Sequence, residues 1–233
     1  MKKIIFFFLL VSLTLISCEP KPGHETTADI IKNAVTDIDG NNYDAVKIGN
    51  QIWMASNLKT THFPSGDTIY IPSEMHPENA FRMPPAGDIN NVDEFGYLYS
   101  YRAATRVCPD GWHLPSRQEW YDLEETIINT PEYLEKSTSV AKALASEKHW
   151  IHVSDFGTPG FQTSTNNATG FSALPADMYA GYESSLGSMA AFWTTDILND
   201  EKAVGVFLGV QKTGLSDNRY GYDYALSVRC VKD

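Results

Sequence analysis

Basic residues are scarce in this sequence. Its 18 lysines and arginines stand against 29 aspartates and glutamates, which gives a formal net charge of −11 at pH 7. Nucleic acids and anionic lipid headgroups attract proteins through clustered basic side chains, so both are poor partners for an acidic chain. We therefore expect no nucleic-acid partner.

The N-terminal apolar run is too short to cross a membrane. It covers residues 4–16, whereas a transmembrane helix needs roughly 20 apolar residues. Two lysines precede it, which is the order of a bacterial export signal. The residues Leu15-Ile16-Ser17-Cys18 then resemble a lipobox, the motif that ends in the acylated cysteine of bacterial lipoproteins. We expect a signal peptide over residues 1–17 and a membrane anchor of acyl chains on Cys18. The alternative is a plain signal peptide with an unmodified cysteine.

The residues after Cys18 are polar and carry Pro20, Pro22 and Gly23. This composition is typical of a flexible tether, which we expect over residues 18–34. Residues 35–233 suit one large domain, and an apolar content of 42% is ample for its core. The sequence thus predicts a lipid-anchored protein of the cell envelope, held on the outer membrane.

Cysteine is also scarce, with three residues in the chain. If Cys18 carries lipid, Cys108 and Cys230 remain, and export places them in an oxidising compartment where such a pair usually bonds. A disulfide between these positions would restrict the unfolded chain by roughly 4–5 kcal/mol. Two unrelated buried thiols are the alternative.

Residue patterns predict strands, then helices, then strands. Residues 43–48 and 51–54 are strand-like and are joined by Gly49-Asn50, a hairpin turn. Prolines make residues 60–93 a loop. Ser116 and Glu119 form a capping box that starts a helix with an apolar face of Trp120, Leu123, Ile127 and Ile128. A second helix is expected over residues 138–147, and strands over residues 192–195, 203–210 and 222–231.

Several segments resemble the Fibrobacter succinogenes major paralogous domain. The first matches are Asp37-Ile38-Asp39-Gly40-Asn41, Val46-Lys47-Ile48-Gly49-Asn50-Gln51 and Trp53-Met54-Ala55-Ser56-Asn57-Leu58-Lys59-Thr60. Next comes Cys108-Pro109-Asp110-Gly111-Trp112-His113-Leu114-Pro115-Ser116. The last are Asn166-Asn167-Ala168-Thr169-Gly170-Phe171-Ser172-Ala173-Leu174-Pro175-Ala176, Phe192-Trp193-Thr194-Thr195 and Ser227-Val228-Arg229-Cys230-Val231-Lys232.

The resemblance implies an α+β fold similar to C-type lectin-like domains and to the formylglycine-generating enzyme superfamily. In that fold two helices pack on small twisted antiparallel sheets, with long loops on one side. Members of the family are typically envelope or surface proteins and often lipoproteins. The family offers no settled activity to transfer.

No catalytic or metal constellation stands out. Formylglycine-generating enzymes use a reactive cysteine pair, and no cysteine beyond Cys108 and Cys230 is left for that role. His149, His152 and Asp155 would suit a metal only on a helix, and the glycine-rich run beyond them favours a helix end. The segment from Asp37 opens like a calcium loop but has Ile48 at its twelfth position, where a glutamate is needed. We expect no cofactor and no metal.

Exposed aromatic residues can bind sugars without calcium, because their rings stack on apolar sugar faces. The candidate ligand residues are Tyr179, Tyr182, Asp217, Asn218 and Tyr220. The alternative is that these tyrosines belong to turns or to the core. The sequence favours a non-catalytic envelope lipoprotein that binds an extracellular glycan or a surface protein. An enzyme of the formylglycine-generating type and a structural component of a surface complex are the alternatives.

Overall fold

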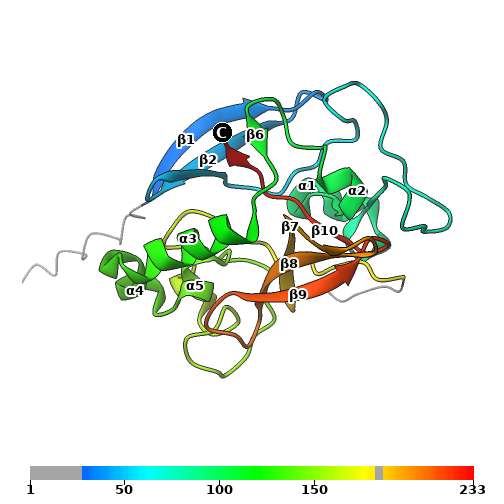
Figure 1. Ribbon diagram of the computed structural model, residues 1–233. Helices are drawn as coiled ribbons and strands as arrows, with labels where there is room; N and C mark the ends of the chain where they lie inside the picture. Colours follow the sequence, from blue (N-terminus) through cyan, green and yellow to red (C-terminus); the bar gives the residue numbers. More distant parts are fainter. Residues whose placement is uncertain (1–27, 182–185) are drawn as a thin grey trace, which may run out of the picture.

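The computed structural model describes residues 28–181 and 186–233, which form two sheets with short helices packed around them (Figure 1). The first sheet has the strand order β1-β2-β3-β11-β6, and every neighbouring pair in it is antiparallel. Its strands are β1 (Asp29–Thr36), β2 (Asn42–Ile48), β3 (Gln51–Met54), β11 (Val231–Lys232) and β6 (Trp112–His113).

The second sheet has the strand order β4-β5-β10-β7-β8-β9. Its strands are β4 (Arg82–Met83), β5 (Leu98–Ser100), β10 (Ala225–Ser227), β7 (Met189–Asn199), β8 (Lys202–Gly209) and β9 (Ser216–Gly221). The pairing of β10 with β7 is parallel and the other pairings are antiparallel. The mixed α and β content agrees with the α+β prediction.

Helical residues are few and most helices are short. The α-helices are α1 (Val92–Phe95), α2 (Tyr101–Ala104), α3 (Arg117–Ile128), α4 (Pro131–Ser137) and α5 (Val140–Leu144). The 3₁₀ turns are η1 (Pro85–Gly87), η2 (Ile89–Asn91) and η3 (Thr163–Thr165). In the part of the chain that the structure describes, no helix has the length and apolar content needed to span a bilayer.

The β2–β3 hairpin and the start of α3 form as predicted. Ile48 pairs with Gln51 across the turn, and Gly49 adopts a φ of 59° that favours glycine. At the helix start, the Ser116 hydroxyl accepts the Glu119 N–H, and the Glu119 carboxylate accepts the Ser116 N–H. Both features are local in sequence, which is why residue patterns reveal them.

Helix α3 lies between the two sheets in Figure 1. Its Trp120 is fully buried, with ring centroids 4.7 Å from Trp53 of β3 and 5.2 Å from Phe192 of β7. One indole therefore packs against both sheets. Ile128, which the sequence placed on the apolar face, is 55% exposed and does not belong to the core.

The C-terminal segment differs most from the prediction. One strand was expected over residues 222–231, but the chain forms β10 in the second sheet and then β11 in the first. In one strand, Tyr222, Tyr224, Leu226, Val228 and Cys230 would share a core face, and the residues between them would share an outer face. Instead Ala225, Ser227 and Arg229, assigned to the outer face, are as buried as their neighbours, because the segment passes between the two sheets.

Three further boundaries differ from the sequence expectations. Residues 29–34, which the sequence assigned to the tether, belong to β1 and pair with β2. The expected helix over residues 138–147 is shorter, because Thr138 ends α4 in a left-handed conformation and Ala145 is extended. Strand β9 and helix α4 were not predicted.

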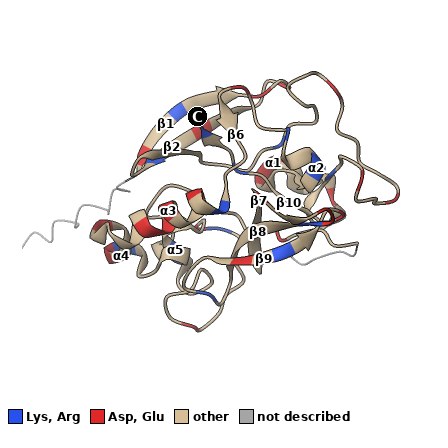
Figure 2. Ribbon diagram, viewed as in Figure 1, with Lys and Arg blue, Asp and Glu red and all other residues tan. Residues whose placement is uncertain are grey.

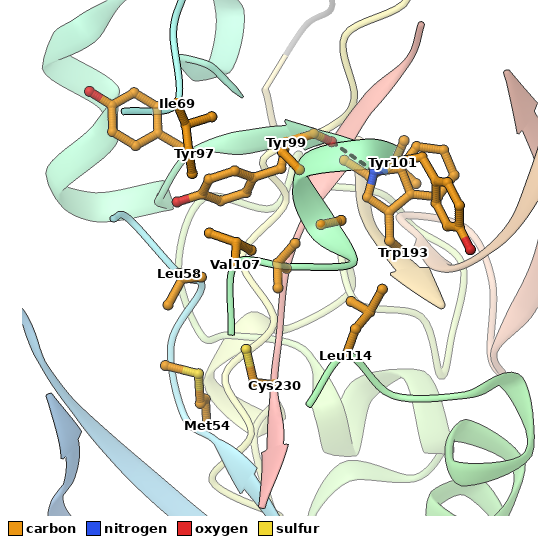
Figure 3. Close-up of a cluster of buried hydrophobic side chains, with 14 of the residues drawn as sticks. Met54, Leu58, Ile69, Tyr97, Tyr99, Tyr101, Val107, Leu114, Trp193 and Cys230 are labelled. Carbon is orange, nitrogen blue, oxygen red and sulfur yellow. Dashed lines mark hydrogen bonds between the residues drawn. The ribbon is translucent and has the colours of Figure 1, made fainter. Parts of the chain in front are cut away.

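A buried cluster of aromatic and aliphatic side chains fills the space beside β5 and the C-terminal segment (Figure 3). The Trp193 indole N–H donates to the Tyr99 carbonyl at 2.7 Å, and the Tyr99 hydroxyl donates to the Thr60 carbonyl at 2.7 Å. These bonds tie the long loop after β3 to β5, and β5 to β7. The cluster thus fixes the base of that loop.

The expected disulfide is confirmed. Cys108 and Cys230 are bonded, with an S–S distance of 2.11 Å and a Cα–Cα distance of 6.0 Å. Cys230 is fully buried and lies near Met54 and Val107 (Figure 3). The bond joins the segment after α2 to the residue before β11.

A buried lysine organises the loop after α5. Lys142 is 1% exposed, and its ammonium donates to the Phe161 carbonyl at 2.5 Å, the Gln162 carbonyl at 3.2 Å and the Asn166 Oδ1 at 2.7 Å. Burial lowers the pKa of Lys142 to about 8. The oxygens compensate for the desolvated charge, so this lysine holds the loop in place.

Candidate functional site

A groove runs beside the segment that leads from α2 to β6. It consists of three adjoining hollows of about 270, 450 and 530 Å³. The first and second hollows share Pro64 and Asp110, and the second and third share Thr105 and Arg106. We call the three hollows together the groove. Its walls come from loops and strand ends that lie far apart in the sequence.

The turn at Cys108-Pro109-Asp110-Gly111 forms the middle of the groove. The Trp112 N–H donates to the Pro109 carbonyl at 3.0 Å, and Gly111 has a φ of 77° that other residues rarely adopt. The disulfide fastens this turn to the core through Cys108. A rigid turn therefore projects Asp110 between the first and second hollows.

Asp39 fixes the loop at the first hollow. Its carboxylate accepts the Thr61 N–H at 2.5 Å, the Thr60 hydroxyl at 2.9 Å and His62 Nδ1 at 2.6 Å. Burial alone would raise the pKa of Asp39, but these hydrogen bonds, first that from the Thr61 N–H, lower it to about 2. The ionised carboxylate holds His62 in the wall of the hollow.

His113 lies between two carboxylates at the second hollow. Its Nδ1 is 2.7 Å from Asp233 Oδ1 and its Nε2 is 2.8 Å from Glu119 Oε1. Burial would lower the pKa of His113, but the hydrogen bonds to Glu119 and Asp233 outweigh it and raise the pKa. A neutral imidazole has a single N–H, so both contacts need the protonated ring. His113 thus links β6, the start of α3 and the C-terminal residue by charge.

This cluster predicts a pH-dependent stability. Because the pKa of His113 is raised by folding, its ionic contribution is complete below the unfolded value of about 6.5. It is lost as the pH rises through the folded pKa, so the urea midpoint should fall over that range. In a His113→Gln variant, the urea midpoint should not show this fall with rising pH. In a His76→Gln variant, which changes an exposed histidine, the fall should remain. Equal slopes for wild type and His113→Gln would contradict the assignment.

The other histidine candidates do not form a metal site. His149 Nε2 contacts Glu94 Oε1 at 3.0 Å, and Asp155 accepts a hydrogen bond from Gln211 at 3.0 Å. Within residues 28–181 and 186–233, no three His, Cys, Asp or Glu side chains are grouped so that they could hold a metal ion. The segment from Asp37 is a hairpin turn, in which the Asp37 carboxylate accepts the Asp39 N–H at 3.0 Å.

A family model matches most of the chain. The model of the Fibrobacter succinogenes major domain matches residues 46–232. The chain belongs to this family. No curated protein and no solved structure matches it.

The motif segments of this Fibrobacter succinogenes major domain meet at one buried guanidinium. Arg229 is fully buried and donates to the carbonyls of Met54 at 3.0 Å, Ser172 at 3.2 Å and Phe171. It also donates to Asn57 Oδ1 at 2.8 and 3.1 Å. Burial lowers the pKa of Arg229 to about 9. Several segments that identify the family therefore build its core here, and the segment that starts at Cys108 also lines the groove.

The candidate ligand residues do not form a single site. Asp217 and Asn218 are exposed on β9, whereas Tyr179 is half-buried beside β10, with β7 and β8 between them. Tyr220 is 2% exposed, and its selection as a contact residue is corrected, because its ring packs 5.9 Å from that of Trp193. Burial raises the pKa of Tyr220 to about 12. Tyr182 lies outside the described residues.

Asp217 borders a smaller hollow away from the groove. This hollow has a volume of about 280 Å³ and lies between α3 and the strands β8 and β9. The Tyr121 hydroxyl donates to Asp217 at 2.8 Å, and Arg117 forms an ion pair with the same carboxylate. The Asp217 carboxylate is thus already bound by Tyr121 and Arg117.

Arg102 and Arg106 are groove residues that residue patterns did not reveal. Both are exposed and both line the third hollow. The available signal was two arginines four positions apart in a chain poor in basic residues. In sequence, Tyr101-Arg102-Ala103-Ala104 indicates only a short strand or helix ahead of Cys108.

Proposed function

We propose that the protein is a non-catalytic lipoprotein of the cell envelope whose domain binds an extracellular glycan in the groove. Acyl chains on Cys18 would hold it on the outer membrane. Mass spectrometry of the N-terminal peptide from the purified protein tests the anchor. An unmodified Cys18 would rule out this part of the proposal.

The observation that carries the binding proposal is the shape of the groove. Its three hollows follow one another through shared lining residues, are open to solvent and are lined by charged, polar and apolar side chains. Long polymers such as polysaccharides bind in extended grooves where polar groups meet hydroxyls and apolar groups meet ring faces. The acidic net charge argues against nucleic acid as the occupant.

We also propose that the fold is of the C-type lectin-like kind. Support comes from two sheets of short strands, from long loops and from a disulfide that closes the last segment. Similarity of fold does not by itself identify a ligand, because one fold serves many functions.

The binding proposal is tested by blocking the groove. Thr105 is exposed where the second and third hollows meet, so a Thr105→Trp substitution would fill the passage between them. On an array of extracellular glycans, the full-length wild type should bind at least one polysaccharide. The variant should bind it at least about tenfold more weakly, a change of about 1.4 kcal/mol.

The matched control is Gln118→Trp, which adds the same ring to the exposed side of α3. It should bind as wild type does. If Thr105→Trp also binds as wild type does, the groove is not the binding site. If no glycan binds and surface proteins of the same cell do, the protein-binding alternative replaces the glycan.

A further inference from the structure

Two arginines stand together in the third hollow of the groove. Arg102 belongs to α2 and Arg106 follows in the next turn, so the side chains lie four positions apart on one side of the segment. Thr105, Tyr222 and Ile197 complete this part of the wall. Figure 2 shows basic residues at α2, next to the ends of β7 and β10.

Both guanidinium groups are held in fixed planes. Arg102 Nε donates to the Pro77 carbonyl at 2.9 Å, and its guanidinium carbon lies 5.3 Å from the centre of the Tyr222 ring. Arg106 Nε donates to the Arg102 carbonyl at 3.2 Å, and its guanidinium carbon lies 4.4 Å from the centre of the Phe63 ring. These contacts use Nε and one face of each group. The terminal N–H groups are left for a ligand.

Neither arginine is neutralised by a carboxylate in the described part of the chain. Among residues 28–181 and 186–233, neither forms an ion pair with a carboxylate, although acidic residues outnumber basic ones. Glu78 lines the same hollow, with a side chain 67% exposed and Oε1 3.8 Å from His76 Nδ1. The hollow therefore offers a pair of cations and one carboxylate acceptor.

We propose that the third hollow binds the carboxylate of a uronic acid within an acidic polysaccharide. The planar fork of arginine matches a carboxylate with two parallel hydrogen bonds. Glu78 accepts hydrogen bonds from sugar hydroxyls, which a simple inorganic anion lacks. Ile197, which is 63% exposed, provides apolar surface for the sugar ring. This inference rests on the proposed function, because it names the class of glycan that the groove takes.

The net negative charge of the protein is compatible with this ligand. At physiological ionic strength, charges more than about 8 Å away are largely screened. The charged residues that line the third hollow are the two arginines and Glu78, so its local charge is positive. Binding should depend on this pair and not on a general attraction between protein and polymer.

The test compares polygalacturonate with its fully methyl-esterified form, a neutral chain of the same sugars. Full-length wild-type protein should bind polygalacturonate at least about tenfold more tightly than the ester. An Arg102→Gln/Arg106→Gln double variant should lose at least about tenfold in affinity for the acid form. Arg219→Gln removes an exposed arginine of β9 and should leave the affinity unchanged. Affinity gel electrophoresis measures all of these.

An Arg102→Lys/Arg106→Lys variant keeps both charges and removes the fork, so its affinity should lie between those of wild type and the glutamine variant. Equal binding of acid and ester, or unchanged binding by the glutamine variant, would overturn the inference. If neutral glycans bind in the groove and uronates do not, only the inference fails. If no glycan of either kind binds, the proposed function fails as well.

Discussion

An Arg229→Met variant should be less stable than wild type by about 3–5 kcal/mol. Methionine fills much of the volume but donates no hydrogen bonds, so three buried carbonyls and the Asn57 amide oxygen would lose their donors. Each buried acceptor left without a donor costs roughly 1–3 kcal/mol. The Phe171 and Phe192 rings, which lie 4.4 and 5.7 Å from the guanidinium carbon, would lose a cation as well. Urea unfolding followed by tryptophan fluorescence measures the change.

The matched control is Arg219→Met, which makes the same substitution on exposed β9. It should change the free energy of unfolding by less than about 0.5 kcal/mol. Should Arg229→Met prove too unstable to purify, Arg229→Lys keeps a charge with fewer donors and should unfold at a lower urea concentration than wild type. A stability within about 1 kcal/mol of wild type for Arg229→Met would show that these bonds contribute little.

Removing the disulfide should have the second largest effect. A Cys108→Ala/Cys230→Ala variant should lose roughly 2–5 kcal/mol, because the bond closes a loop across a sequence separation of 122 and restricts the unfolded chain. The double substitution leaves no unpaired thiol at either position. Urea unfolding of oxidised wild type and of the variant gives the difference.

Reduction supplies the control for the disulfide. Wild type in dithiothreitol should unfold near the urea midpoint of the variant, and the variant should not respond to the reductant. If reduction leaves the wild-type midpoint unchanged, the bond does not contribute to stability. Both stability experiments are independent of the ligand.

Local features of the fold were predictable because they depend on neighbouring residues. Gly49-Asn50 marks the hairpin, and Ser116 with Glu119 marks the start of α3. Strand β9 was missed because three consecutive residues in it, Asp217, Asn218 and Arg219, are exposed and polar. An edge strand with a solvated surface carries little apolar alternation. The signal that would have found α4 was Pro131 at its first turn.

Features that depend on distant segments were not predictable. The alternation in residues 222–231 is typical of one long strand, and only the position of the two sheets explains why the chain divides into β10 and β11. The buried position of Arg229 needs hydrogen-bond partners from two distant segments, at Met54 to Asn57 and at Ser172. The groove likewise combines Glu78, Arg106 and Ile197, whose proximity no spacing rule indicates.

The placement of β1 has a mechanical consequence. This strand is the edge of the first sheet, and none of its residues is fully buried. If the chain is held by the anchor proposed at Cys18, a pull on the N-terminal side of β1 would load its hydrogen bonds to β2 one after another, so β1 should peel away before the core yields. Eight peeled residues would add at most about 28 Å of reach. The disulfide and the second and third hollows would remain intact while the strand serves as an extensible link, and the first hollow would lose one lining residue, Thr36.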